Sequence, residues 1–360
     1  MKLNNLSSLL LGALVGAFST SAVAADNGCP APAPAPEKSS CCDSCFPSGG
    51  KFKAGVDYIY WETVEGSLTI GNRITENADG VTIKNENIRP NFGAKSGVKG
   101  NIGYEFGGDD KWDIVAYYGW LPGEASTAKW TTTDNDQFNQ RILLKTQNYD
   151  ILGAVTKLDQ GSDLSANYNT MSGTWKTINQ GVALELGRTL AFGKKFTMRP
   201  HAGLKGAWGH QSYVFGGTVE PGSDVPEKGI TTLNVNLFER YRSIAAQVGL
   251  WATWKICWGI SVVGHIGGSS GYTDWLLKES LLLVDDKTGV LADAHETDRY
   301  PSIGFGVDYY IGLLYSYEYC HMTFSAKLGW EQHVSQQNII NAIGANLGTQ
   351  GLTAGLSVSF

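Results

Sequence analysis

Hydrophobic and polar residues alternate along much of the chain, and the alternation returns in one segment after another. In the last segment, Leu352, Ala354, Leu356, Val358 and Phe360 share one face, with glycine, serine and threonine between them. Successive side chains of a β-strand point to opposite faces of a sheet, so this period predicts strands with one apolar and one polar face. Segments of this kind are 51–62, 93–106, 111–121, 173–190, 196–210, 241–254, 258–270, 300–313, 320–332 and 347–360.

The connections between these segments are alternately long and short. The long ones are 63–92, 122–172, 211–240, 271–299 and 333–346, and the short ones are 107–110, 191–195, 255–257 and 314–319. A soluble β-sandwich has no need for this order, whereas a transmembrane barrel has short periplasmic turns and long extracellular loops. We therefore predict an all-β, transmembrane antiparallel up-and-down β-barrel of about ten strands. Apolar stretches at 142–144 and 151–155 would add a hairpin and make about twelve strands, or fold inward as a constriction.

A bilayer explains why one face of each strand is apolar. Hydrocarbon cannot pair backbone N–H and C=O groups, and a closed barrel pairs them internally without leaving an edge. Tryptophans should gather at the two interfaces. The outer strand ends carry Trp61, Trp120, Trp208 and Trp330, and the inner ends carry Trp112, Trp254 and Trp258. Pro200 lacks a ladder donor, so we expect a bulge there. A terminal phenylalanine after alternating apolar residues is typical of outer-membrane barrels.

The composition agrees with a barrel. Charged residues make up 17% of the chain, against about 25% in ordinary soluble domains. Glycine is abundant, at 45 of 360 residues, and the aromatic fraction is 11%. The mean hydropathy is only -0.15, which does not favour a bundle of apolar helices. The net charge of -6, without a basic run, excludes a typical nucleic-acid-binding protein, so no nucleic acid is expected as a partner.

The first 25 residues have the pattern of a signal peptide. Lys2 is followed by an apolar run from Leu9 to Phe18 and by the small residues Ala22-Val23-Ala24. The run is too short to cross a bilayer, which takes about 20 residues. We predict a signal peptide at 1–25, a Pro/Ala- and Cys-rich periplasmic tail at 26–50 and an outer-membrane barrel at 51–360. Both chain ends should then be periplasmic.

All six cysteines are predicted to lie on the periplasmic side, where disulfides persist. They are Cys29, Cys41, Cys42 and Cys45 in the tail, and Cys257 and Cys320 at inner strand ends. Bonds within the tail, to the barrel or between molecules all remain open. A zinc site in the tail is the alternative, but there is no pair of CxxC units, and we expect no metal and no cofactor. The alternating Pro-Ala run before them should form an extended spacer of roughly 20 Å.

The predicted inward faces carry charges of both signs in equal number. These pore-lining candidates are Lys53, Lys95, Lys99, Arg199, Lys205 and Lys327, with Asp57, Glu105, Asp113, Glu185, Asp308 and Glu331. They would line a wet channel, or pair across the lumen and fill it. A filled lumen is a serious alternative, because barrels of about eight strands are just wide enough to be packed by side chains.

Several stretches, in order along the chain, resemble the legionella- and chlamydia-type major outer membrane proteins. They are Tyr58-Ile59-Tyr60-Trp61, 97–104 with Lys111-Trp112-Asp113, Leu184-Glu185-Leu186-Gly187-Arg188 and 199–208. The resemblance runs from about Asp57 to Phe360. It implies a passive pore in a Gram-negative outer membrane, with no catalytic residues. The chlamydia-type relatives further imply disulfide cross-linking between envelope proteins.

The prediction is therefore a non-enzymatic outer-membrane porin for small hydrophilic solutes and ions. Its partners would be outer-membrane lipid and either further copies of itself or disulfide-linked envelope proteins. One alternative is a structural or adhesive protein with a closed barrel. A remote alternative is a surface protease, for which His210, Asp274 and His333 lie near outer strand ends.

Overall fold

The chain divides into two compact units, Met1–Cys41 and Cys42–Phe360. The computed structural model describes part of the second unit, namely residues 49–65, 71–77, 82–88, 91–107, 111–126, 130–131, 138–144, 170–218, 230–285, 289–339 and 345–360. The predicted signal peptide and almost all of the predicted tail lie outside these residues. Within them, no helix is long and apolar enough to cross a membrane.

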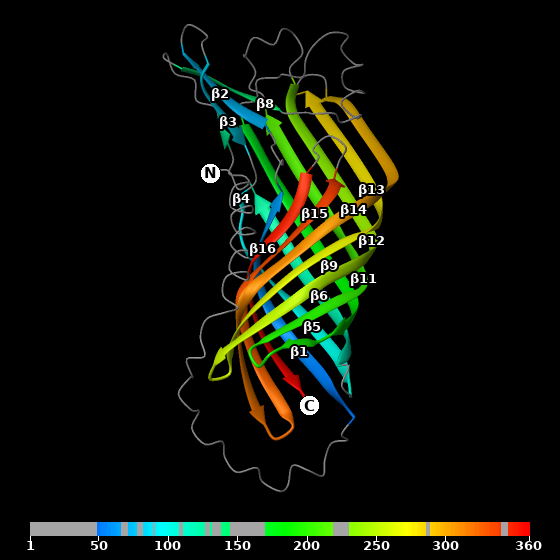
Figure 1. Cartoon of the computed structure of the whole chain (residues 1–360). Coiled ribbons are helices and arrows are strands. Elements are labelled where there is room, and N and C mark those ends of the chain that lie inside the picture. Colours follow the sequence, from blue (N-terminus) through cyan, green and yellow to red (C-terminus); the bar gives the residue numbers. More distant parts are fainter. Residues whose placement is uncertain are drawn as a thin grey trace. The chain divides into compact units, whose positions relative to one another are not determined.

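Ten antiparallel strands of the described residues form a closed barrel, as the alternation predicts (Figure 1). Each pairs with the next, and the last pairs with the first, with Val56 opposite Leu356. The barrel strands are β1 (Gly50–Glu65), β5 (Lys95–Phe106), β6 (Trp112–Ser126), β9 (Thr170–Arg188), β11 (Phe196–Thr218), β12 (Ile230–Cys257), β13 (Ile260–Asp285), β14 (Gly289–Tyr319), β15 (Met322–Ile339) and β16 (Ala345–Ser359). The terminal Phe360 helps to close the ring, since its backbone exchanges two hydrogen bonds with Phe52.

Short strands occupy parts of the predicted loops 63–92 and 122–172. The strands β4 (Asn91–Phe92), β7 (Trp130–Thr131) and β10 (Leu190–Phe192) pair with the barrel strands β6, β9 and β11. A separate three-stranded sheet has the order β3-β2-β8, formed by Thr82–Ile88, Gly71–Asn77 and Phe138–Leu144. The stretch 142–144 thus belongs to this sheet, so the expected extra barrel hairpin is wrong for it, and 151–155 lies outside the described residues.

The strands β12, β13 and β14 are much longer than predicted, with 28, 26 and 31 residues. Most of the predicted loops 211–240 and 271–299 is therefore paired strand. The sequence pattern does not reveal these extensions, because the apolar residues move from the outward face of the strand to its inward face. Between Trp254 and Ile244 of β12, the outward side chains are apolar and are exposed or half-buried, and we call this stretch on β11–β14 the apolar belt. Beyond Arg242, in the projecting part, Leu233, Val235 and Leu237 point inward and are buried.

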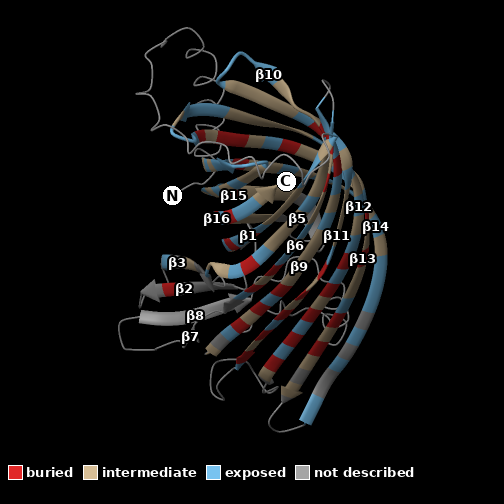
Figure 2. Ribbon diagram, turned by 90° about the horizontal axis from the view of Figure 1, so that it is seen from below, coloured by how far each residue is buried: buried red, intermediate tan, exposed pale blue. Residues whose placement is uncertain are grey.

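In Figure 2, bands of buried residues alternate with less buried ones along several strands and are most frequent towards one end of them. In the projecting part, the outward neighbours Asn234 and Asn236 are exposed. Within the apolar belt the inward residues include Ser243 and Gln247. The two-residue period continues through both parts, but the apolar face is outside in one and inside in the other.

Three sequence expectations about the strand ends need correction. The turns lie at Trp258-Gly259 and at Cys320-His321, rather than within 255–257 and 314–319. Trp258 and Gly259 both have positive φ, 51° and 78°, as a two-residue turn of the hairpin type requires. Pro200 forms no bulge, because the ladder of β11 with β9 begins only at His201. Trp61 is 5% exposed and faces inward, so it does not belong to an interfacial girdle.

The remaining predicted girdle tryptophans are exposed, as expected. Trp112, Trp254 and Trp258 lie at or near strand ends, whereas Trp120, Trp208 and Trp330 lie near the middle of β6, β11 and β15 rather than at the predicted outer ends. Trp112 also has the guanidinium of Arg188 over its ring, 5.8 Å from the ring centroid.

Candidate pore lumen

Eleven of the twelve predicted pore-lining residues take part in ion pairs with one another. Most of these pairs join strands that are not neighbours in the sheet, so the side chains meet in the barrel interior. None of these ion pairs includes Lys95, which lies opposite Trp61 in the β1–β5 ladder. The choice of face from the two-residue period thus agrees with the contacts, whereas the pairing could not be read from sequence.

One group of ion pairs, the inner charge cluster, lies towards the end of the barrel that carries the short turns. Arg199 of β11 donates to Asp113 of β6 at 2.9 Å and to Glu185 of β9 at 3.1 Å. Lys53 of β1 contacts Asp113 at 3.2 Å and Glu105 of β5 at 2.7 Å. The Asp113 side chain is only 2% exposed. The cluster joins five of the ten strands.

A second group, the central charge cluster, connects β5 with β15, β14 and β11. Lys99 contacts Glu331 at 2.7 Å, and Lys205 contacts Asp308 at 3.1 Å. His333 lies between the two carboxylates: its Nε2 is 3.0 Å from Glu331, and its Nδ1 bonds Asp308. These contacts form a continuous polar chain across the interior.

Lys327 of β15 and Asp57 of β1 form a further pair, 2.8 Å apart, across the intervening β16. Glycines make room for such long side chains. A Cβ atom on Gly355 would collide with Asp57, and one on Gly187 would lie 2.6 Å from the guanidinium of Arg199. Inward glycines therefore serve the lumen directly, which explains part of the high glycine content.

Two inward histidines were not among the predicted lumen residues. The Nε2 atoms of His201 and His265 are 3.1 Å apart, and Trp251 stacks on His265 with a centroid distance of 4.3 Å. Glu185 lies 3.4 Å from Nδ1 of His201. The parity of β11 already placed His201 on the face of Arg199, and counting only charged residues overlooked it. Within the described residues, no group of three or more His, Cys, Asp or Glu side chains is suited to a metal.

The projecting part has a different interior. Trp175 and Trp275 are almost fully buried there, and their indole N–H groups donate to Gln211 at 3.0 Å and to Ser302 at 2.7 Å. On the opposite wall, Ile59, Trp61 and Leu121 form a buried apolar cluster. The interior behind the apolar belt therefore continues into a region whose buried residues are mostly apolar, although Glu239 and Glu279 are buried there as well.

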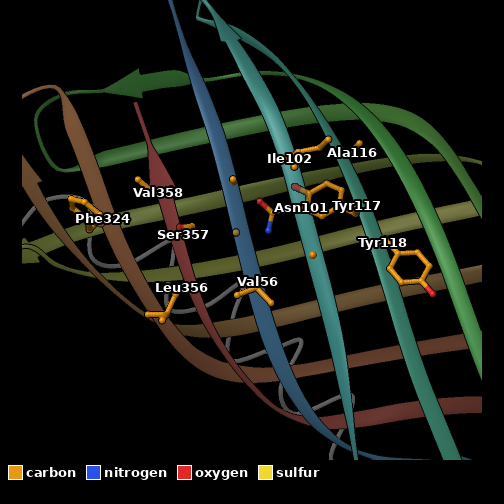
Figure 3. A pocket seen from close by; sticks show the side chains of 13 residues that line it. Val56, Asn101, Ile102, Ala116, Tyr117, Tyr118, Phe324, Leu356, Ser357 and Val358 are labelled. Atoms are coloured by element: carbon orange, nitrogen blue, oxygen red, sulfur yellow. The ribbon is translucent and has the colours of Figure 1, made fainter. Parts of the chain in front are cut away.

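A pocket in the barrel wall is lined by residues of both faces of the sheet (Figure 3). It has a volume of about 700 Å³ and lies over β15, β16, β1, β5 and β6. Small residues, Ala54 and Ala116, line it, and the exposed side chains of Val56, Ile102 and Leu356 surround it. The outward apolar side chains fit lipid chains, whereas the polar Asn101 and Ser357, which have the inward parity, line the same pocket from the other face.

The three residues considered for a protease do not converge. His210 stacks on Phe238 on the outward face, with a centroid distance of 5.8 Å. Asp274 is also outward and is held by Arg299, whereas His333 belongs to the central charge cluster inside. These three residues therefore do not form the site that the remote protease alternative would require.

The two described cysteines lie at the end of the barrel that also carries the C-terminus. Cys257 pairs with Ile260 beside the first two-residue turn, and Cys320 lies in the second, with φ of 52°. The other four cysteines, and with them the predicted tail pairings, lie outside the described residues.

Comparison with protein families matches residues 47–359 to the Legionella pneumophila major outer membrane protein precursor. The chain belongs to this family. The match covers every described barrel strand in full or nearly so, and it identifies the chain as an outer-membrane barrel protein. A search of curated proteins found no match.

Three solved structures are similar to this chain at low TM-score and low identity. A major outer membrane protein from Thermus thermophilus has a TM-score of 0.32 and 10% identity, covering 86% of this chain and 99% of its own. The outer membrane protease OmpT from Escherichia coli has a TM-score of 0.40 and 10% identity, with coverage of 86% and 96%. A Pseudomonas aeruginosa FadL homologue has a TM-score of 0.27 and 8% identity, with coverage of 87% and 90%.

Proposed function

We propose that the chain is a narrow outer-membrane porin that lets small ions and small hydrophilic solutes diffuse passively. The observation that carries this proposal is the contrast between the two interiors. Replacing buried ion pairs by well-packed apolar residues is often neutral or stabilising. The buried residues of the projecting part are mostly apolar, with Glu239 and Glu279 as charged exceptions, while the interior behind the apolar belt keeps eleven paired charges. Charges in that place favour a hydrated path.

The ion pairs set the width of this path. Ten strands make a barrel only slightly wider than one that side chains fill. Lys99 and Glu331 stand three strands apart and still touch, so their contact crosses part of the lumen. Small ions with part of their hydration shell fit this arrangement better than sugars or peptides do.

The second candidate is a closed barrel with a structural or adhesive role. The continuous chain of contacts from Lys205 through His333 to Lys99 favours it. Conductance separates the candidates. The chain folded into a planar bilayer should give small, reproducible steps, and the double variant Lys99→Ser/Glu331→Ser should give larger ones because both charged groups are removed together. Silence from both proteins would contradict the porin and support the closed barrel.

We also propose that both termini and the two-residue turns face the periplasm. A membrane-impermeant thiol reagent tests this on intact cells, with all native cysteines replaced by serine. Asn236→Cys in the projecting part should be labelled, and His321→Cys in the turn should not. The reverse pattern would overturn the orientation.

Disulfide linkage and self-association belong to the same proposal. Cysteines of the tail would bond to Cys257, to Cys320 or to another envelope protein, so non-reducing gels should show bands that a reductant removes. A series of high-mass bands that disappears when Cys29, Cys41, Cys42 and Cys45 are all replaced by serine would indicate linkage between molecules through the tail. We propose no catalytic activity, no cofactor and no nucleic-acid partner.

A further inference from the structure

The outward face of β11–β14 changes from uncharged to charged along one line. Antiparallel register aligns outward residues into rows across these strands. The innermost row of the apolar belt contains Phe196, Trp254, Val262 and Leu313, and the outermost contains Gly206, Ile244, Tyr272 and Ile303. The outward residues of these strands carry no charge from one row to the other.

The height of this uncharged band matches a bilayer. Trp254 and Ile244 are ten positions apart on β12, which at about 3.3 Å per residue is roughly 33 Å along the strand. With a tilt of about 40°, the band is roughly 25 Å high, the value typical of outer-membrane barrels. The next row is therefore the first one outside the hydrocarbon.

The next two rows carry three arginines. Arg242 lies between Trp208 and Asp274 in the first row, and Arg240 and Arg299 flank Leu276 in the second. All three arginines are exposed. We call Arg240, Arg242 and Arg299, with Asp274, the outer arginine cluster, and its formal charge is +3 - 1 = +2.

Asp274 orients one of these arginines without neutralising the cluster. Nε of Arg299 donates to Asp274 at 2.9 Å and Nη2 donates at 2.6 Å, while the Arg299 side chain stays 71% exposed. These hydrogen bonds lower the pKa of Asp274, against desolvation, and the charges of Arg299, Arg242 and Arg240 lower it further. All three arginines are therefore close enough to Asp274 to act on its carboxylate electrostatically.

The opposite wall lacks such a surplus. Beyond Tyr60 the first ionisable outward residue of β1 is Glu62, and on β6 and β9 Glu124 lies 3.8 Å from Lys176. Among the described outward positions at this level, positive charge is thus concentrated on β12–β14. Positive charge gathered on one wall indicates a binding site for an anionic partner, whereas charges that only keep a protein soluble need not be gathered in one place.

We propose that the outer arginine cluster binds the phosphate groups of a phosphorylated lipid in the outer leaflet. Arginine binds phosphate through paired N–H donors, and its position one row above the hydrocarbon is where lipid headgroups lie. Ile244, Tyr272 and Ile303 below it would contact the acyl chains of the same molecule. The proposal rests on the orientation proposed above, which places this end at the cell surface.

Lipid binding to the full-length chain in detergent micelles tests the cluster. The probes are diphosphorylated lipid A and the same lipid with its phosphates removed, and native mass spectrometry counts the bound molecules. Each arginine replaced by glutamine should weaken binding of the phosphorylated lipid about fivefold, and all three about a hundredfold. The matched control is Arg188→Gln, which removes the same charge at the opposite edge of the barrel wall and should bind as the native chain does.

Two outcomes would overturn the proposal: unchanged binding in the Arg240→Gln/Arg242→Gln/Arg299→Gln variant, or equal binding of the dephosphorylated lipid. If the triple variant does not fold, Arg242→Gln alone supplies the same comparison with a fivefold expectation. Binding in micelles depends neither on conductance nor on orientation. A silent pore therefore counts against the proposed function and leaves the lipid result to be judged separately. Reversed cell labelling would place the cluster at the inner leaflet and would overturn this proposal together with the proposed orientation.

Discussion

The strand β12 contains two regions with opposite patterns. Behind the apolar belt, Ile244 and Val248 face outward and Gln247 faces inward, whereas in the projecting part Leu233 and Leu237 face inward and Asn236 faces outward. Backbone pairing is continuous through both, apart from shifts near the two ends of the strand. The same alternation therefore describes a lipid-facing wall in one region and a water-facing wall in the other.

The comparison shows that the solvent outside decides which face is apolar. Hydrocarbon requires apolar outward side chains and leaves the interior open to charge. Above the belt, water accepts polar outward side chains, and the interior gains stability from apolar burial as in a soluble protein. The ion pairs of one interior and the packed aromatics of the other follow from this difference.

The largest effect is expected from breaking the inner charge cluster. Arg199→Met leaves Asp113 and Glu185, both nearly buried, without their guanidinium partner. The free energy of unfolding should fall by about 3–5 kcal/mol. Urea unfolding followed by tryptophan fluorescence measures this. Adding Asp113→Asn and Glu185→Gln to this variant should recover much of the lost free energy. A small loss in Arg199→Met alone would mean that water already screens these charges.

In the projecting part, removing apolar volume should matter instead. Leu237 is 4% exposed, and Leu237→Ala should cost about 2–5 kcal/mol of unfolding free energy because it leaves a cavity. Ile244→Ala is the control on the same strand, since its side chain is 60% exposed and lipid can fill the space. Equal costs in the same urea titration would contradict the division of β12 into two regions.

Space for the lumen side chains provides a third test. Gly187→Ala would place a Cβ atom 2.6 Å from the guanidinium of Arg199, so unfolding should become easier by about 1–3 kcal/mol. Gly268→Ala, on the outward face of β13 with nothing within 4 Å, should be nearly neutral. A neutral Gly187→Ala would show that the inner charge cluster tolerates rearrangement.

The smallest effect concerns the outer arginine cluster and pH. Arg299 lowers the pKa of Asp274, so the pair stabilises the folded state above the ordinary pKa of 3.8 and loses this contribution as the pH falls. The melting temperature of Asp274→Asn should lie slightly below that of the native chain at pH 7 and approach it at pH 3. A difference that grew on acidification would contradict the sign.

The sequence predicts the ten barrel strands but not how long three of them are. Alternating apolar residues located all ten strands, because lipid imposes one apolar face on each. The continuation of β12, β13 and β14 was taken for loops, since the outward positions become polar where Asn234 and Asn236 meet water. Reading the apolar residues of the other face, such as Leu233 and Val235, would have revealed it.

The lumen was predictable in part for a similar reason. Parity alone placed residues such as Lys53 and Asp308 on one face, and the ion pairs agree with that choice. Their partners depend on strand stagger and on the curvature of the closed sheet, which no local pattern encodes. His333 was misplaced for this reason: its position near a strand end suggested the rim, while its side chain joins Glu331 and Asp308.

The long paired strands of the projecting part also bear on resistance to proteolysis. Proteases bind their substrates as extended chains whose backbone N–H and C=O groups are available for new hydrogen bonds. Residues 233–242 of β12 and 270–283 of β13 already use these groups in ladders with their neighbours. A polypeptide of this kind can extend beyond the bilayer and still resist digestion, because its exposed part contains little backbone that an enzyme can engage.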